Sequence, residues 1–342
     1  MKRTTSIIAF SAFILLASFS FKRGSVVRIA KTDTEELNLK GRIHGISEAI
    51  YNGAVKADKV YKAGDVPQKM DSTWFDEKGN KTDEKVYDAA GNILNEWLNS
   101  YDANENVLAF VYLVKGKQRQ KDAYKYDSLN RVVEWVRYKG ADSLFEKDTY
   151  KYDENGHQDE QDVDEHYPVK QNFKKFYAFD DAGNKVTERE FSLGKSERTT
   201  HTWKYDAEGR VTEEDDYWPN GTIQAKIMFT YNAGRLKERK ALLPDGSVNN
   251  RDVYTYNGNG YKAVLDMYNN QGKLYHYYTY AYDMHGNIKE QKEFKVFTDE
   301  GPQMEDADTY ELEYDKTGNW IKKTDLKLDG TVLLSERAIT YY

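Results

Sequence analysis

Residues 203–210 read Trp-Lys-Tyr-Asp-Ala-Glu-Gly-Arg, and this stretch decides the fold because the same turn returns along most of the chain. The first residues of nine copies of this turn, Tyr205 among them, are separated along the chain by 25, 26, 27, 26, 26, 25, 26 and 32 residues. The other copies of the turn begin at Tyr101, Tyr126, Tyr152, Phe179, Tyr231, Tyr256, Tyr282 and Tyr314, and two closer copies begin at Phe75 and Tyr87. Such a regular period indicates a repeat architecture.

The side chains of the turn explain its shape. Asp or Asn at the second position accepts a hydrogen bond from the backbone N–H two residues on, which nucleates the bend. Glycine at the fifth position adopts a positive φ that other residues resist, and Asn130 replaces it once. The Asp–Gly pair is therefore expected from turn formation alone, without a ligand.

The strands that enter these turns alternate in polarity. Tyr124 and Tyr126 lie on one face because they are two residues apart, and Lys125 lies on the other. Trp203 and Tyr205 repeat this arrangement around Lys204. One aromatic face and one mostly polar face at a period of two are typical of a half-buried β-strand.

A second, weaker turn falls about midway between successive Tyr-Asp turns, for example at residues 219–221, 244–246, 270–272 and 328–330. Two turns per repeat leave strands of about 8 residues, which is within the usual range. Because wide sheets curl, the sequence predicts an all-β fold, an elongated, curved, single-layer antiparallel meander of repeated β-hairpins. The aromatic face is expected inside the curve, with contacts mostly between neighbouring repeats.

The repeats resemble those of a known bacterial family. Residues 124–131, 203–210 and 280–287 (the last reading Tyr-Ala-Tyr-Asp-Met-His-Gly-Asn) are similar to the YD repeats of the Rhs family, and residues 217–222 resemble MORN-like hairpins. The resemblance covers roughly residues 70–342 and implies a β-hairpin repeat architecture. Fewer repeats, a longer period and the absence of an Asp-Pro cleavage signature or a following toxin segment favour a short envelope protein over a closed, toxin-holding shell.

The segments beside the repeats have a different character. Residues 1–20 are predicted to be a signal peptide, because Lys2 and Arg3 precede a short apolar run that ends in small residues; an uncleaved membrane anchor is the alternative. Residues 21–69 are expected to form a non-repeat cap with a short strand at 43–51, and residues 70–342 the repeat domain. Since the chain ends within a strand, we expect an exposed C-terminal edge.

Composition narrows the class of protein. The chain has no Cys, so a disulfide framework and a thiolate metal site are excluded. Its net charge of −7 falls to −9 once Lys2 and Arg3 are removed, and its lysines are interspersed, which argues against nucleic acid as a partner. The predicted location is the periplasm, the cell surface or the exterior, with no integral membrane segment after signal cleavage.

Few residues stand out as a site. Four tryptophans could stack on sugar rings: Trp97, Trp135, Trp218 and Trp320. Six glutamates that follow the turns form either a ladder of ion pairs with lysines or a row that binds cations or sugar hydroxyls: Glu96, Glu134, Glu188, Glu213, Glu238 and Glu290. The acidic stretch at 153–166 suggests calcium, but Gln158 stands where an EF-type loop needs Gly.

No catalytic, cofactor-binding or metal-binding residue is predicted, since nucleophile elbows, phosphate loops and paired histidine motifs are absent from the sequence. The favoured hypothesis is a non-enzymatic, exported scaffold that binds an envelope protein through its repeat sheet or its terminal edge strand. The alternative is a carbohydrate-binding protein whose partner is a cell-surface glycan. A glycan-acting hydrolase is the third hypothesis.

Overall fold

The computed structural model describes residues 32–56, 59–166, 171–192, 194–297 and 301–342. Within them lie one helix, α1, and 23 strands. The bounds are α1 Asp33–Glu36, β1 Ile43–Lys56, β2 Lys59–Lys62, β3 Lys69–Phe75, β4 Lys81–Tyr87, β5 Ile93–Tyr101, β6 Val107–Val114, β7 Lys117–Tyr126, β8 Val132–Lys139, β9 Ser143–Tyr152, β10 Gln158–Glu165, β11 Gln171–Phe179, β12 Lys185–Ser192, β13 Arg198–Tyr205, β14 Val211–Tyr217, β15 Ile223–Asn232, β16 Arg235–Leu242, β17 Val248–Tyr256, β18 Lys262–Tyr268, β19 Leu274–Tyr282, β20 Ile288–Phe297, β21 Gly301–Tyr314, β22 Trp320–Lys327 and β23 Val332–Tyr341. The predicted signal peptide, residues 1–20, lies outside the described residues.

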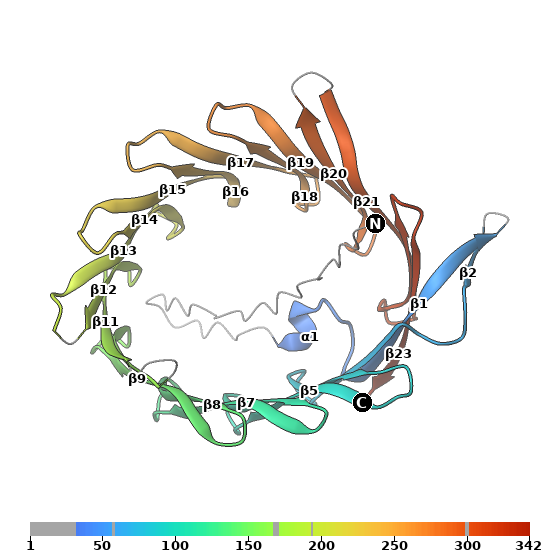
Figure 1. Ribbon diagram of the computed structural model, residues 1–342, viewed down its shortest axis with the longest axis horizontal. Helices are drawn as coiled ribbons and strands as arrows, with labels where there is room; N and C mark the ends of the chain where they lie inside the picture. Colours follow the sequence, from blue (N-terminus) through green and yellow to red (C-terminus); the bar gives the residue numbers. More distant parts are fainter. Residues whose placement is uncertain (1–31, 57–58, 167–170, 193, 298–300) are drawn as a thin grey trace, which may run out of the picture.

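The strands close into a single antiparallel barrel (Figure 1). Each strand from β3 to β23 pairs with the next one along the chain, and β1 pairs with both β3 and β23. Because β2 pairs only with β1, 22 of the 23 described strands form the ring. The predicted all-β hairpin meander is confirmed, whereas the prediction of an open, curved layer is wrong.

Strand β1 is the reason that the ring closes. Residues 43–52 pair with residues 333–341 of β23, and residues 45–50 pair with residues 69–74 of β3. The expected strand at 43–51 therefore exists, but it lies between the first and last strands of the repeat. The predicted exposed C-terminal edge is wrong, because β1 satisfies the backbone groups of β23 that would otherwise be unpaired.

The seam around β1 carries the hydrophobic cluster of the described residues. Ile43, Ile46 and Phe75 are 2%, 9% and 2% exposed, and Leu39 and Ile339 pack against them. Since the ring wall is one sheet thick, few other apolar side chains are buried. Apolar packing is thus concentrated where two strands distant in sequence meet.

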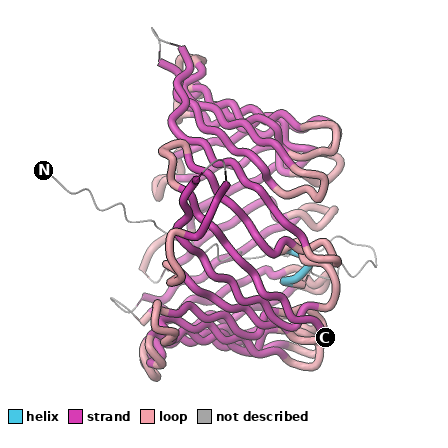
Figure 2. The backbone as a smooth tube through the Cα atoms, turned by 90° about the vertical axis from the view of Figure 1, so that its right-hand side faces the viewer, coloured by secondary structure: helices cyan, strands magenta, loops and turns pink. Residues whose placement is uncertain are grey.

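The inner face of the ring is the face on which α1 lies (Figures 1 and 2). The Asp33 carboxylate accepts a hydrogen bond from the Lys81 backbone N–H at 2.5 Å, and the Tyr101 hydroxyl donates to the Lys81 carbonyl at 2.8 Å. Tyr101 therefore faces inward. Side chains that oppose each other in antiparallel strands lie on the same face of the sheet. Starting from Tyr101, the strand register therefore shows which side chains of the other strands face inward. The predicted aromatic inward face is found.

Successive turns lie at opposite ends of the barrel. We call the end with the inward tyrosines the motif rim; it holds the turns at 76–80, 102–106, 127–131, 153–157, 180–184, 206–210, 233–234, 257–261, 283–287 and 315–319. The weaker turns, for example 218–222 and 243–247, lie at the opposite rim. The copy at Tyr87 also lies there, between β4 and β5. Phe75 and Tyr87 are therefore separated by one turn and one strand, which is half a repeat.

The turns have the predicted chemistry and one further element. The Asp76 Oδ1 atom accepts hydrogen bonds from the backbone N–H groups of Lys78 and Asn80, both at 2.9 Å. The Asn80 side chain donates to Asp76 Oδ2 at 3.0 Å, and Arg131 Nε donates to Asp127 Oδ2 at 2.7 Å. In these turns the sixth residue of the motif, Asn or Arg, therefore solvates or neutralises the second oxygen of the Asp, and His157 contacts Asp153 Oδ2 in the same way at 3.1 Å.

The tyrosine of the motif joins each repeat to the one before it. In seven repeats its hydroxyl donates to a backbone carbonyl just after the preceding turn of the motif rim, and we call these seven residues the ladder tyrosines; the Tyr314 hydroxyl donates instead to the carboxylate of Asp283 in the preceding turn. The bond to the carbonyl is made by Tyr101 to Lys81, Tyr126 to Val107, Tyr152 to Val132, Tyr205 to Lys185, Tyr231 to Val211, Tyr256 to Leu236 and Tyr282 to Lys262, at 2.6–2.9 Å. Burial raises the pKa of Tyr126 to about 12, so this hydroxyl keeps the proton that it donates. At Phe179 the bond is absent, and the ring stacks on His157 at 4.6 Å between centroids.

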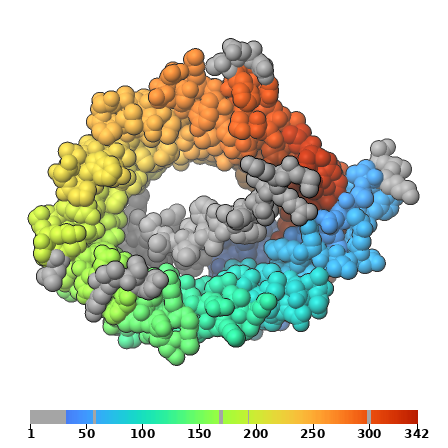
Figure 3. Space-filling model, in the orientation of Figure 1, coloured from blue at the N-terminus to red at the C-terminus, as the bar shows by residue number. Residues whose placement is uncertain are grey.

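The ring encloses open space (Figure 3). Neighbouring strands lie about 4.8 Å apart at right angles to their length, so 22 strands make a circumference of at least about 105 Å and an equivalent diameter of at least about 34 Å. Barrels of this strand number are too wide for their own side chains to fill. Among the described residues, no helix has the length and apolar character that crossing a membrane requires.

Replacing a single ladder tyrosine with phenylalanine tests the repeat-to-repeat bond. Tyr126→Phe, Tyr152→Phe and Tyr231→Phe should each lower the free energy of unfolding by about 1 kcal/mol, because each leaves a carbonyl without its donor. Urea denaturation measures the change. Tyr61→Phe, on a ring that is 50% exposed, is the control; ladder variants as stable as this control would contradict the assignment.

Candidate functional site

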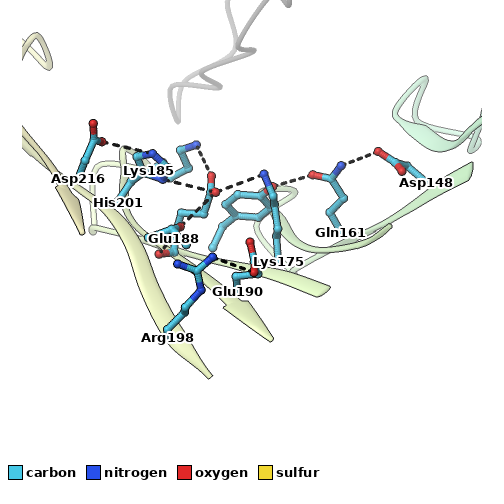
Figure 4. Close-up of polar contacts among 11 residues, drawn as sticks. Asp148, Gln161, Lys175, Lys185, Glu188, Glu190, Arg198, His201 and Asp216 are labelled. Carbon is cyan, nitrogen blue, oxygen red and sulfur yellow. Dashed lines mark hydrogen bonds and ion pairs between the residues drawn. The ribbon is translucent and has the colours of Figure 1, made fainter. Parts of the chain in front are cut away.

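A network of charged side chains lies on the inner wall between β9 and β14 (Figure 4). We call it the inner-wall network and define it as Asp148, Gln161, Lys175, Tyr177, Lys185, Glu188, Glu190, Arg198, Thr200, His201 and Asp216. The aromatic inward face is therefore interrupted by charge in the middle of the wall. Sequence alternation alone did not predict this, because it marked aromatic positions only near the turns.

Glu188 is the centre of the network. It is 8% exposed, and its carboxylate lies 3.4 Å from Lys175 Nζ, 3.7 Å from Lys185 Nζ and 3.6 Å from His201 Nδ1. The Thr200 hydroxyl lies within hydrogen-bond distance of the Glu188 carbonyl and of its carboxylate, both at 3.2 Å. A carboxylate so deeply buried needs these cations to remain charged.

Burial and neighbouring charges have different effects on the pKa values of Glu188 and Lys185. Burial alone would raise the pKa of Glu188, but Lys175, Lys185 and His201 outweigh it, and the pKa falls below its ordinary value. Burial lowers the pKa of Lys185 despite the attraction of Glu188. Because Glu188 has several cationic neighbours and Lys185 has one close carboxylate, we treat the pair as ionised, with the carboxylate the better stabilised partner.

The network continues on both sides of Glu188. His201 Nε2 lies 3.3 Å from Asp216 Oδ1, so the imidazole lies between the carboxylates of Glu188 and Asp216. In the other direction the Tyr177 hydroxyl donates to Gln161 Oε1 at 2.7 Å, and Gln161 Nε2 donates to Asp148 Oδ2 at 2.6 Å. Arg198 pairs with Glu190 at 3.0 Å.

Two shallow cavities accompany the network. One of about 250 Å³ is lined by Lys175, Glu188, Arg198, His201 and Asp216 among others. A larger one of about 580 Å³ lies between the neighbouring turns at 180–184 and 206–210, against Trp203 and Tyr205. The first is almost wholly polar, and the second combines an aromatic wall with turn carboxylates and backbone.

A one-residue offset explains why Glu188 faces inward. In β14, Glu213 lies opposite the outward-facing Lys204, whereas in β12 the residue opposite the outward-facing Ala178 is Thr187. Glu188 is the next residue and therefore points to the other face. Among the glutamates that follow turns of the motif rim, the signal in the sequence is the distance from the turn: Glu188 follows Gly183 by five residues, and Glu213 follows Gly209 by four.

The other glutamates of the predicted set form ion pairs with nearby basic side chains, as the first interpretation expected. Glu134 contacts Lys125 at 2.7 Å and Lys147 at 2.8 Å. The remaining pairs are Glu96 with Lys85, Glu213 with Lys204 and Lys226, Glu238 with Lys240 and Arg251, and Glu290 with Lys292. Ion pairs of this kind, across strands or along one strand, stabilise a sheet modestly and need no ligand.

The structure does not bring the four predicted stacking tryptophans together. Trp97 stacks on Tyr112 at 5.3 Å, the Arg137 guanidinium lies 4.7 Å from the Trp135 ring, and the Arg337 guanidinium lies 3.3 Å from the Trp320 ring. Trp218, at the opposite rim, is 48% exposed. The tryptophan that lines a cavity is Trp203, which the sequence identified only as a strand residue.

The acidic stretch at 153–166 is divided by the turn and by β10. Asp153 accepts backbone hydrogen bonds within its turn, Glu160 pairs with Lys151 and Lys174, and Asp164 contacts His166. Among the described residues, no group of three or more His, Cys, Asp or Glu side chains is placed to hold a metal ion.

Comparisons with known proteins give weak structural likenesses. No family model and no curated protein sequence matches the chain. The TcdB2-TccC3-Cdc42 crystal structure is 14% identical, with a TM-score of 0.44, over 80% of this chain and 16% of that one. The Photorhabdus luminescens Tc holotoxin pore gives 14% identity, a TM-score of 0.31 and coverages of 80% and 17%. A porin-like protein from Bacteroides uniformis ATCC 8492 is 7% identical, with a TM-score of 0.27, over 88% of this chain and 98% of that one.

The chain thus spans about one sixth of the toxin chains that it resembles, with 16% of the first of them covered. The two toxin structures and the porin-like protein all give TM-scores below 0.5. At such low identities and TM-scores they carry no argument about function.

Substitution of Glu188 tests the inner-wall network. Glu188→Gln should lower the free energy of unfolding at pH 7 by about 1–3 kcal/mol, because Lys175 and Lys185 lose their counter-charge. The pKa of Glu188 is depressed on folding, so this stabilisation is present above its ordinary pKa of 4.5 and is lost as pH falls through the folded value. The loss caused by Glu188→Gln should therefore shrink on acidification, as measured by urea denaturation from pH 7 to pH 3.

The control is Glu313→Gln, which removes one exposed ion pair with Lys322 and should change stability by less than about 0.5 kcal/mol. An equal effect of the two substitutions at pH 7 would contradict the central position of Glu188.

Proposed function

We propose that the chain is a non-enzymatic binding protein of the bacterial envelope that holds a polypeptide against the inner wall of its ring. This proposal retains the hypothesis of protein binding but places the binding surface on the inner wall of the ring and not on the terminal edge strand. The terminal edge of β23 is paired with β1 and is no longer offered to a partner. The proposal therefore assigns the binding to the inner wall.

The observation that carries the proposal is a segment of the chain itself. Residues 32–40 lie on the inner face, where the Thr34 N–H donates to the Gly79 carbonyl at 3.2 Å. The Lys40 N–H donates to Asn319 Oδ1, and Asn319 Nδ2 donates back to the Lys40 carbonyl, both at 2.8 Å. Turns of the motif rim thus bind a polypeptide backbone, and the same turn recurs around the ring.

The dimensions and chemistry of the ring support this function. An equivalent diameter of at least about 34 Å exceeds the 10–12 Å diameter of a helix with its side chains, so an entering segment has room beside the wall. Tyrosine and tryptophan supply flat contact area with a polar handle. Charged side chains between them provide the polar contacts that orient a partner.

Carbohydrate binding is the second candidate, supported by the cavity of about 580 Å³ between the turns at 180–184 and 206–210. Trp203 gives it an aromatic wall, and Asp180, Asn184 and Asp206 give it hydrogen-bonding groups. A flat ring beside polar side chains suits a sugar. The cavity is small compared with the ring interior, so a polypeptide remains the better-supported ligand.

A pull-down with the full purified chain tests the proposal. Immobilised protein would be exposed to solubilised bacterial envelope, and bound material would be identified by mass spectrometry and glycan analysis. One protein should be retained near stoichiometry. Ala241→Trp, which adds bulk to the inner face, should abolish this retention, whereas Ala281→Trp, on the outer face, should leave it intact.

Equal retention by the two tryptophan variants would contradict binding inside the ring. Retention of a glycan that is lost with Trp203→Ala would favour the second candidate. An eluate that contains neither class of ligand would overturn both.

A further inference from the structure

Four charged side chains lie in one row across the inner wall. Asp122 of β7 opposes Arg137 of β8, Arg137 opposes Glu146 of β9, and Glu146 opposes Glu165 of β10. Arg137 donates two hydrogen bonds to Asp122, at 2.9 and 2.8 Å. The one cation of the row is therefore already paired, and two carboxylates oppose each other beside it.

Like charges directly opposite each other in a sheet are destabilising. Neither Glu146 nor Glu165 forms an ion pair or side-chain hydrogen bond with another described residue. Burial, Asp148 and Glu165 together raise the pKa of Glu146. The free protein thus holds a repulsive pair on its inner wall at a position where a basic residue would relieve the repulsion.

Asp148 provides a second and independent observation. It lies two residues from Glu146 on the same face and is 3% exposed. Gln161 occupies its Oδ2 atom at 2.6 Å, while its buried Oδ1 atom has no hydrogen-bond partner among the described residues. Buried polar atoms are almost always satisfied, so an unsatisfied carboxylate oxygen beside two unpaired carboxylates points to a missing donor.

Several other carboxylates of the inner wall have basic partners within the chain. Glu48 pairs with Arg337 at 2.8 Å, and Asp308 pairs with Lys327 at 2.7 Å. The group of Glu146, Asp148 and Glu165, which we call the acidic triad, departs from this pattern. The part of the chain that the structure describes contains no group of three or more His, Cys, Asp or Glu side chains placed to hold a metal ion, and the acidic triad is no exception.

We propose that the acidic triad binds an ammonium or guanidinium group that enters the ring. Such a group brings several N–H donors and a positive charge to the two opposed glutamates and to the free Asp148 oxygen. The group belongs either to a lysine or arginine side chain of a polypeptide or to a free polyamine. This inference gives the chemistry of the ligand and, in its polypeptide form, rests on the proposed function.

Titration calorimetry of the full chain with spermidine and with a pentalysine peptide tests the site. Both probes should bind the unaltered chain, and Glu146→Gln/Glu165→Gln should weaken binding at least tenfold. Glu160→Gln is the matched control, since it removes a carboxylate of β10 that pairs with Lys151 and Lys174 outside the triad. It should change affinity less than twofold.

Thermal unfolding without a probe gives a second readout. The double substitution should raise the melting temperature, because it removes the opposed charges, and should abolish the further rise that spermidine causes in the unaltered chain. Tighter binding of pentalysine would identify a polypeptide source, and tighter binding of spermidine a polyamine source.

Equal loss of affinity in the double variant and in Glu160→Gln would overturn the site in favour of diffuse attraction to an acidic chain. Stronger binding of Ca²⁺ than of either amine, lost in the double variant, would also overturn it. Because these probes need no envelope partner, a failed pull-down and a failed titration remain separate results.

Discussion

The structure depends on one strand outside the repeat, β1, lying between the first and last strands of the hairpin array. A meander of this kind leaves an unpaired edge at each end, and every unpaired backbone group there either meets water or invites another chain. β1 pairs with β23 on one side and with β3 on the other. This single insertion turns a curved sheet into a ring, creates an inside, and removes the edge as a binding surface.

The wall remains one sheet thick and buries few apolar side chains, so its order comes from repeated polar contacts. In many of the turns, an Asp accepts hydrogen bonds from backbone N–H groups and from the side chain of a following Asn or Arg. Each ladder tyrosine then bonds the preceding repeat through a backbone carbonyl. Both contacts are local in structure and recur with the sequence period, which is how a chain of mean hydropathy −0.88 supports so large a sheet.

Much of the fold could be predicted because the strands and turns depend on sequence patterns only a few residues long. Alternation at Tyr124 and Tyr126 gave the strand and its inward face, and the Asp–Gly pairs gave the turns. Closure could not be predicted, because it depends on pairing between residues 43–52 and 333–341, which no period links. The strand at 43–51 was foreseen, but nothing local specified its two neighbours.

The candidate site was predictable to a smaller degree. The six glutamates that follow the turns were predicted, and an ion-pair role was one of the two interpretations given for them. Glu188 was included in this set, but a one-residue offset turns its side chain to the inner face. Charged rows such as Asp122, Arg137, Glu146 and Glu165 arise only when four strands align. Trp97, Trp135 and Trp320 were chosen for exposure, a property that depends on the side chains that cover them.

Cross-linking of the seam tests closure most directly, and the absence of cysteine from the chain makes the experiment clean. Ser47 and Ala338 are register partners in β1 and β23, and opposed residues in such strands lie within the range that a disulfide spans. We expect Ser47→Cys/Ala338→Cys to form an intramolecular disulfide in the full chain under mild oxidation, detected as a mobility shift reversed by reductant. Ser47→Cys/Thr187→Cys, across the ring, should form none. Failure of the first pair to cross-link, with the fold intact by circular dichroism, would contradict a ring closed by β1.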